Sequence, residues 1–134
     1  MSINYPNLET ISRDLLLHKK AQLLIVSKNQ VIDDIRTLLL NGYVLFGENR
    51  VQEAKQKFTL KLFEEFPNLK LHLIGPLQSN KTKLALSIFH CIQSIDRKRL
   101  IDAIVKENKN RDLTLTKEFY IQINIGHESQ KAGV

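Results

Sequence analysis

The fold of this chain is decided by the stretch Leu23-Leu24-Ile25-Val26-Ser27-Lys28. Its four consecutive apolar residues predict a strand buried on both faces, as in a parallel sheet. Ser27 and Lys28 end the apolar run with a hydroxyl group and an amine. A lysine at the end of a buried strand is either a solvated loop residue or an amine placed to attack a carbonyl group. The rest of the chain has to decide between these two interpretations.

Strand and helix patterns alternate along the chain. Further strands are predicted at residues 43–46 and 119–125, at residues 69–74, where apolar residues alternate with Lys70 and His72, and, from a weaker pattern, at residues 91–95. Between the strands, apolar residues recur three and four positions apart, which predicts helices within residues 31–40, 51–66, 80–88 and 96–105, after a first helix within residues 6–16. Asn41-Gly42 is expected to end one of these helices, Asp96 is expected to cap the last one, and residues 107–117 are expected to form a loop.

The segments between the predicted strands are too long for hairpins, so the pattern predicts β/α units on a parallel sheet. Two parallel architectures fit it. An open, doubly wound sheet is complete with five strands, whereas a (β/α)₈ barrel needs about 200 residues or more. The chain has 134 residues, enough for a single domain spanning residues 1–134. The residue pattern alone leaves both architectures open.

The composition is typical of a globular protein. Apolar residues make up 43% of the chain and charged residues 25%, which argues against disorder. No apolar run approaches the roughly 18 residues that span a membrane, and the N-terminal residues lack the pattern of a secretory signal. Cys91 is the only cysteine, and its apolar neighbours predict a buried thiol that is not a nucleophile. We therefore expect a cytoplasmic protein.

The net charge of +6 raises the question of nucleic-acid binding. The lysines are scattered along the chain, often with acidic neighbours, and no basic run is interleaved with aromatic residues. A solvated, charged helical surface explains most of this charge. A basic α/β module that binds nucleic acid stays open as a minor alternative.

Polar clusters follow the predicted strands at equivalent places. They are Ser27-Lys28, Gly47-Glu48-Asn49, the segment from Gly75 to Lys81, and Ser94-Ile95-Asp96. In either parallel architecture, the C-terminal ends of the strands share one edge of the sheet, and that edge carries the binding site. The shared position of the clusters therefore favours a functional role for Lys28.

Several common motifs are absent or incomplete. Lys81-Thr82 resembles the end of a phosphate-binding loop, but Asn80 replaces the required glycine and the spacing is wrong. The four histidines show no metal-ligand spacing, and a histidine within a strand, such as His72, is more often packed and hydrogen-bonded than a ligand. Glu48 and Glu53 are interpreted as helix-start glutamates rather than as a catalytic pair. No catalytic residue is assigned.

At the strand ends the sequence resembles a known family. The motifs that carry the resemblance are Leu24-Ile-Val-Ser-Lys28, Phe46-Gly-Glu-Asn-Arg-Val-Gln-Glu53, Leu71-His-Leu-Ile-Gly-Pro-Leu-Gln-Ser-Asn-Lys81, Ser94-Ile-Asp96, Ile121-Gln-Ile-Asn-Ile125 and Glu128-Ser-Gln-Lys-Ala-Gly133. Together they resemble the pyridoxal phosphate homeostasis protein family, whose fold is similar to the N-terminal barrel domain of alanine racemase (fold type III). The resemblance covers almost the whole chain from Leu23 onward.

The resemblance implies an α/β fold, specifically part of a (β/α)₈ TIM-like barrel with about five parallel strands that do not close. It implies that pyridoxal 5′-phosphate is held as a Schiff base on Lys28, which matches the lysine at the end of the family's first barrel strand. Asn49 and His72 match residues that line the cofactor pocket, and Lys131 matches a second lysine near its mouth. The implied role is cofactor homeostasis without turnover, with pyridoxal-dependent enzymes as recipients of the cofactor.

The sequence departs from the family pattern after Val134, where further strands, a phosphate cradle and an arginine facing the pyridine nitrogen are expected. We therefore expect a C-terminally truncated copy that is inactive or weakly binding. Its unpaired strand edges favour self-association or pairing with a complementary C-terminal fragment. A racemase-like pyridoxal enzyme that uses Lys28 as a base is the main alternative function.

Overall fold

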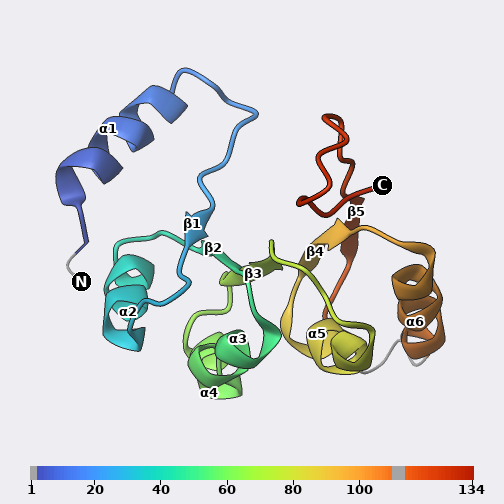
Figure 1. Ribbon diagram of the computed structural model, residues 1–134. Helices are drawn as coiled ribbons and strands as arrows, with labels where there is room; N and C mark the ends of the chain where they lie inside the picture. The colour runs from blue at the N-terminus through green and yellow to red at the C-terminus, as the bar shows by residue number, and fades with distance from the viewer. Residues whose placement is uncertain (1–2, 110–113) are drawn as a thin grey trace.

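The computed structural model describes residues 3–109 and 114–134 (Figure 1). In chain order the elements are α1 (Tyr5–Leu15), β1 (Ile25–Val26), α2 (Ile32–Leu40), β2 (Leu45–Glu48), α3 (Val51–Lys57), α4 (Leu60–Glu65), β3 (Lys70–Leu73), the 3₁₀ turn η1 (Ser79–Lys81), α5 (Thr82–Ile88), β4 (Cys91–Ile95), α6 (Lys98–Asn108) and β5 (Glu118–Ile121). Strands and helices therefore alternate as the sequence predicts. Within the described residues, no helix combines the length and the apolar character needed to cross a bilayer.

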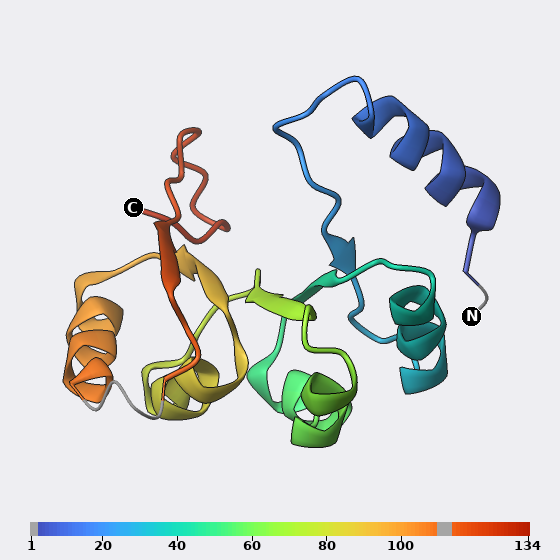
Figure 2. The same ribbon diagram turned by 180° about the vertical axis from the view of Figure 1, so that it is seen from behind.

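The strands form one five-stranded sheet in the order β1-β2-β3-β4-β5, and every neighbouring pair is parallel. Helices α2 to α6 lie along one side of this row of strands, and the reverse view in Figure 2 shows the same arrangement. A doubly wound sheet reverses its strand order and carries helices on both faces. Sequential order with helices on one side is the arrangement of a (β/α)₈ barrel, of which these residues form an unclosed part.

The hydrophobic core lies between the sheet and these helices. Phe46, Leu71 and Ile92 point to this side from three neighbouring strands and are fully buried. The ring of Phe46 packs against that of Phe58 at the end of α3, with ring centroids 5.9 Å apart. Because side chains alternate along a strand, His72 lies on the opposite side of the sheet from Leu71. We call this opposite side the open face.

The first strand is shorter and more exposed than the sequence predicts. β1 contains only Ile25 and Val26, and the Val26 side chain is 44% exposed. The expectation of burial on both faces is wrong because β1 is an outer strand of the sheet, and helix packing covers only one of its faces. A run of four apolar residues cannot distinguish a central strand from an edge strand of an unclosed sheet.

Other boundaries also differ from the predictions. β2 begins two residues later than predicted and includes Gly47 and Glu48, and β5 is shorter than predicted. The stripe within residues 51–66 is split into α3 and α4 at Thr59, whose hydroxyl group accepts a hydrogen bond from the Leu62 amide at 3.4 Å. Asp96 does not cap α6; it pairs with Arg97, which occupies the cap position.

Two boundaries confirm the sequence pattern. α2 ends at Asn41-Gly42, where Gly42 has a φ of +86°, and β4 has the predicted limits. A left-handed residue after a helix favours glycine because a side chain is strained in that conformation. The loop predicted at residues 107–117 begins later than expected because α6 extends to Asn108, and its residues 110–113 lie outside the described part of the chain.

Candidate functional site

The C-terminal ends of the strands lie at one edge of the sheet, since all neighbouring pairs are parallel. Val26 on β1 pairs with Gly47 on β2, and Gly47 pairs with His72 on β3. Lys28 and Asn49 each follow the paired residue of their own strand by two positions. Lys28 and Asn49 are therefore at one level on neighbouring strands, and His72 lies about 7 Å deeper along the sheet.

Lys28 is presented by a tight turn. The Ser27 carbonyl accepts a hydrogen bond from the Gln30 amide at 3.1 Å, so Lys28 and Asn29 form the two central positions of the turn. Asn29 has a φ of +60°, a conformation that asparagine tolerates better than most residues. The Lys28 side chain is exposed on the strand-end edge. A reactive amine in this position is accessible to a carbonyl compound that approaches from the open face.

Asn49 is half-buried, and the chain is tightly packed around it. A Cβ atom added to Gly75 would lie 2.2 Å from the Asn49 carbonyl oxygen, so only glycine fits at this contact between the ends of β2 and β3. The Ser94 hydroxyl group donates to the Gly75 carbonyl at 2.6 Å, which ties the end of β4 to the same point. Asn49 also lines a cavity of about 610 Å³ with the cationic Arg50, Lys81 and Arg97.

His72 lies half-buried on the open face, where the Gln93 side-chain amide contacts its Nδ1 at 2.9 Å. Because an amide nitrogen only donates, Nδ1 accepts, and a neutral His72 carries its proton on Nε2. Burial lowers the pKa of His72, which favours this neutral form. His72 therefore has a hydrogen-bonding partner, as expected for a strand histidine, and it also faces the side from which a ligand would approach Lys28.

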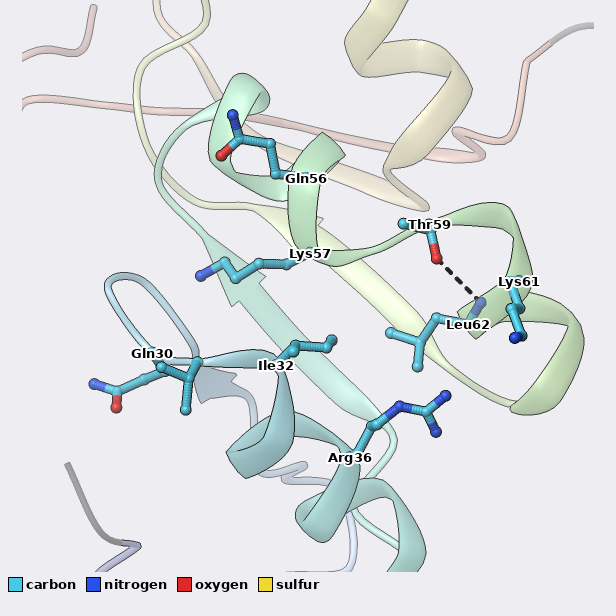
Figure 3. Close-up of a pocket in the computed structure, with 9 residues that line it drawn as sticks. Gln30, Ile32, Arg36, Gln56, Lys57, Thr59, Lys61 and Leu62 are labelled. Atoms are coloured by element: carbon cyan, nitrogen blue, oxygen red, sulfur yellow. Dashed lines mark hydrogen bonds between the residues drawn. The ribbon is translucent and has the colours of Figure 1, made fainter.

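A buried ionic network lies beneath the Lys28 turn on the helix side of the sheet. The Ser27 hydroxyl group donates to Glu48 Oε1 at 2.7 Å, and Lys57 Nζ lies 2.6 Å from the same oxygen. The Glu48 side chain is 0% exposed, and its Oε2 atom has no hydrogen-bond partner. Figure 3 shows the Lys57 side chain extending from α3 across the end of β2 towards the segment that carries Gln30.

This network corrects the sequence-based interpretation of Glu48. Glu48 is the last residue of β2 and not a helix-start glutamate, whereas Glu53 does lie in the first turn of α3. The residue pattern alone indicates no role for Lys57. The available signal was the spacing of four residues between Glu53 and Lys57, which places an acid and a base on one side of a helix.

Other candidate groups have structural roles. Cys91 is fully buried, and burial raises the pKa of its thiol to about 11, so the thiol is not activated. His90 Nδ1 accepts a hydrogen bond from the Leu71 amide at 3.1 Å. Lys131 is exposed and pairs with Glu128 at 2.5 Å. In the described part of the chain, no cluster of three or more histidine, cysteine or acidic residues is arranged to hold a metal ion.

The two half-buried histidines, His72 and His90, predict a loss of stability in mild acid. Burial lowers the pKa of His72 and of His90 from 6.5, so the unfolded chain binds protons more readily than the folded chain. The free energy of unfolding is therefore expected to be fully retained above pH 6.5 and to fall as the pH drops below it. Hydrogen bonds from Lys57 and from the Asn29 amide lower the pKa of Glu53 from 4.5, so its contribution is lost only at lower pH.

Thermal unfolding at about pH 7.5 and pH 5.5 measures this effect. The double variant His72→Gln/His90→Gln is expected to reduce the difference between the two melting temperatures, since glutamine does not titrate. Equal melting temperatures of the unsubstituted chain at both pH values would contradict the prediction.

The chain is similar in sequence to curated proteins that are named pyridoxal phosphate homeostasis protein. The chain is 40% identical over 113 residues to the pyridoxal phosphate homeostasis protein of Pasteurella multocida, which covers 84% of this chain and 47% of that protein. It is 40% identical over 114 residues to the homologue of Haemophilus influenzae, covering 84% of this chain and 46% of the homologue. No protein-family model matches the chain.

The fold is similar to that of PipY from Synechococcus elongatus PCC7942. The structure of PipY without pyridoxal phosphate aligns with a TM-score of 0.75 and 32% identity, covering 91% of this chain and 57% of PipY. The structure of PipY with pyridoxal phosphate bound aligns with a TM-score of 0.72 and 32% identity. The chain thus spans about half the length of the curated relatives it matches.

Proposed function

We propose, from the premise that this chain is homologous to pyridoxal phosphate homeostasis proteins, that it binds pyridoxal 5′-phosphate covalently through Lys28. The observation that carries the proposal is the Lys28 turn, which presents a primary amine at the strand-end edge of a barrel-like parallel sheet. Ligands of barrel proteins bind at this edge. We further propose that residues 1–134 fold as a single domain and that the role is to hold and hand on the cofactor, without turnover.

The described residues fit the reactive end of the cofactor. When bound, pyridoxal 5′-phosphate supplies an aldehyde that condenses with an amine. Lys28 is the amine, and its accessible position allows it to lose a proton to solvent before it attacks. Asn49, which follows β2 at the same level as Lys28, would offer its side-chain amide to the cofactor. His72 lies about 7 Å deeper along the sheet, on the open face. Its neutral imidazole would donate a hydrogen bond from Nε2.

Absorbance titration of the chain with pyridoxal 5′-phosphate tests the proposal. A bound cofactor is expected to produce a visible band distinct from that of the cofactor in buffer, and the band is expected to saturate with added protein. A spectrum identical to the sum of the separate components at all concentrations would overturn the proposed function.

The phosphate group of the cofactor requires contacts of its own. Charge-assisted hydrogen bonds to phosphate contribute strongly to affinity. We propose that a partner segment adds such contacts, since this chain covers 47% of the Pasteurella multocida relative. Among the described residues, β1 and β5 each pair with one neighbouring strand. Around β5, Tyr120, Ile121 and Ile123 are more than half exposed, as expected for a strand that another segment covers.

Fragment complementation is expected to raise the affinity for the cofactor. The added fragment is the part of the Pasteurella multocida relative that follows the region matched by this chain. We expect at least about a tenfold decrease in the dissociation constant for pyridoxal 5′-phosphate, because the fragment supplies phosphate contacts and covers the exposed edge. The measurement is the absorbance titration with and without the fragment. An unchanged dissociation constant, with co-elution of the two fragments in gel filtration, would contradict the proposed partner role.

A further inference from the structure

The strongest feature outside the expected cofactor contacts is the way in which the Lys28 turn is held. The backbone groups on either side of Lys28, the Ser27 carbonyl and the Asn29 amide, are both bound by side chains of α3. Lys57 Nζ donates to the Ser27 carbonyl at 2.6 Å, and Glu53 Oε1 accepts from the Asn29 amide at 2.6 Å. Lys57 and Glu53 are joined to each other at 2.8 Å. Lys57 and Glu53 therefore bind the backbone immediately before and immediately after Lys28.

Lys57 also pairs with a carboxylate in the protein interior. Lys57 Nζ also lies 2.6 Å from Glu48 Oε1, and the side chains of Lys57 and Glu48 are 11% and 0% exposed. Glu48 in turn accepts the Ser27 hydroxyl group at 2.7 Å. A buried charged pair of this kind is worth little as general stabilisation, because its desolvation offsets much of its attraction. Its clearest consequence is geometric, since removing any member releases a contact to the turn.

We propose that Glu48, Glu53 and Lys57 form a clamp that fixes the Lys28 turn and so holds the amine in the orientation in which it reacts with an aldehyde. Lys57 and Glu53 are positioning residues, because they contact the backbone of the turn and not the reacting atoms. This inference rests on the proposed function of Lys28 for its chemical consequence, and on the geometry alone for the clamp itself.

The condensation of Lys28 with the aldehyde needs no further reagent. The Lys28 ammonium group loses a proton to solvent, its nitrogen adds to the aldehyde carbon, and water leaves as the C=N bond forms. Borohydride, added as a reductant, converts this bond to a stable secondary amine and permits detection by mass. A turn that samples many conformations would hold the amine in the reactive orientation less often. The yield of the adduct would then be lower, because orientation contributes much to the rate of such reactions.

The first test uses the cofactor-free chain. Lys57→Met removes the ammonium group and keeps most of the stem, and Glu53→Ala removes the acceptor of the Asn29 amide without leaving Glu48 unpaired. Hydrogen exchange of the peptide that contains residues 27–31 is expected to accelerate at least about tenfold in both variants, with exchange in β3 and β4 unchanged. Unchanged exchange in both variants would overturn the clamp.

The second test measures the reduced adduct on Lys28 at equimolar pyridoxal 5′-phosphate. The yield is expected to fall at least about fivefold in Lys57→Met and to be restored by Lys57→Arg, whose guanidinium group can donate to the same acceptors. Arg36→Met is the matched control: it breaks an ion pair with Glu65 at the same helical layer without touching the turn. Leu100→Ala controls for stability, because it removes buried volume in α6 far from the turn.

The outcomes separate the two proposals. If Leu100→Ala lowers the yield as much as Lys57→Met at an equal loss of melting temperature, or if Lys57→Arg restores nothing, the positioning role is wrong. If the unsubstituted chain gives no adduct on Lys28 while exchange at residues 27–31 accelerates in the variants, the proposed cofactor function fails and the clamp stands.

Discussion

Replacing Lys28 with alanine is expected to abolish the visible absorbance band that the chain produces with pyridoxal 5′-phosphate. The expected loss is at least about tenfold in band intensity at a fixed cofactor concentration, because no other amine can form the same bond in the same place. Lys28 lies at the centre of a turn that follows a barrel-like strand, and it is exposed to the side where the cofactor would approach. The substitution removes no buried contact, so the fold is expected to be retained.

Two companion variants make the Lys28 prediction specific. Lys28→Arg keeps the positive charge but lacks a primary amine, so it is expected to behave like Lys28→Ala. Lys131→Ala removes an exposed lysine that pairs only with the neighbouring Glu128 in the described structure, and it is expected to keep the band. Retention of the full band in Lys28→Ala, with the same saturation curve as the unsubstituted chain, would rule out Lys28 as the cofactor-bearing residue.

Gly75→Ala is expected to be the most destabilising single substitution at the strand-end edge. The added Cβ atom would lie 2.2 Å from the Asn49 carbonyl oxygen and 2.7 Å from its Cα atom, and both are backbone atoms. They cannot move away unless the ends of β2 and β3 separate, which also breaks the bond from the Ile74 amide to the Glu48 carbonyl at 3.0 Å. The expected cost is at least about 3 kcal/mol in the free energy of unfolding.

Urea denaturation of Gly75→Ala measures this cost, and Gly126→Ala is the matched control. The nearest atoms to a Cβ at Gly126 belong to the flexible Glu128 side chain, the closest at 3.3 Å. That control is expected to change the free energy of unfolding by no more than about 0.5 kcal/mol. If both variants unfold at the same urea concentration as the unsubstituted chain, the close packing of Asn49 against Gly75 is not a feature of the folded protein.

The order and type of the elements could be predicted from the sequence because apolar spacing reports local structure. Residues 31–40 carry a complete helical stripe and end in Asn41-Gly42, and the predicted helix agrees with α2. The segment Cys91–Ile95 lies between two neighbouring strands in the sheet, and the predicted strand agrees with β4. Both segments satisfy local and tertiary preferences at once, which is the situation in which sequence patterns are most informative.

The predictions from sequence are wrong where tertiary structure determines the burial of a strand or the end of a helix. The pattern at Leu23–Val26 is as apolar as that of a central strand, but sheet order places β1 at an edge. The stripe within residues 51–66 is continuous in sequence, but α3 ends at its C-cap, Phe58, whose ring packs against Phe46, and α4 begins after Thr59. Neither the sheet order nor this helix break is encoded in the spacing of apolar residues.

Part of the candidate site could be predicted from the sequence, and part could not. The positions of Lys28 and Asn49 at one edge follow from parallel strand order and could be predicted from sequence. The buried network could not, because Glu48 is a charged residue at a position where burial is unfavourable unless a partner is present. That partner, Lys57, is nine residues further along the chain and reaches Glu48 only because α3 folds back across the end of β2.

Peptide mapping after borohydride reduction shows directly whether Lys28 carries the cofactor. The unsubstituted chain is mixed with equimolar pyridoxal 5′-phosphate, reduced, digested and analysed by mass spectrometry. The added mass is expected predominantly on the peptide that contains Lys28. An even distribution over the exposed lysines, or a modification concentrated on another lysine, would contradict it.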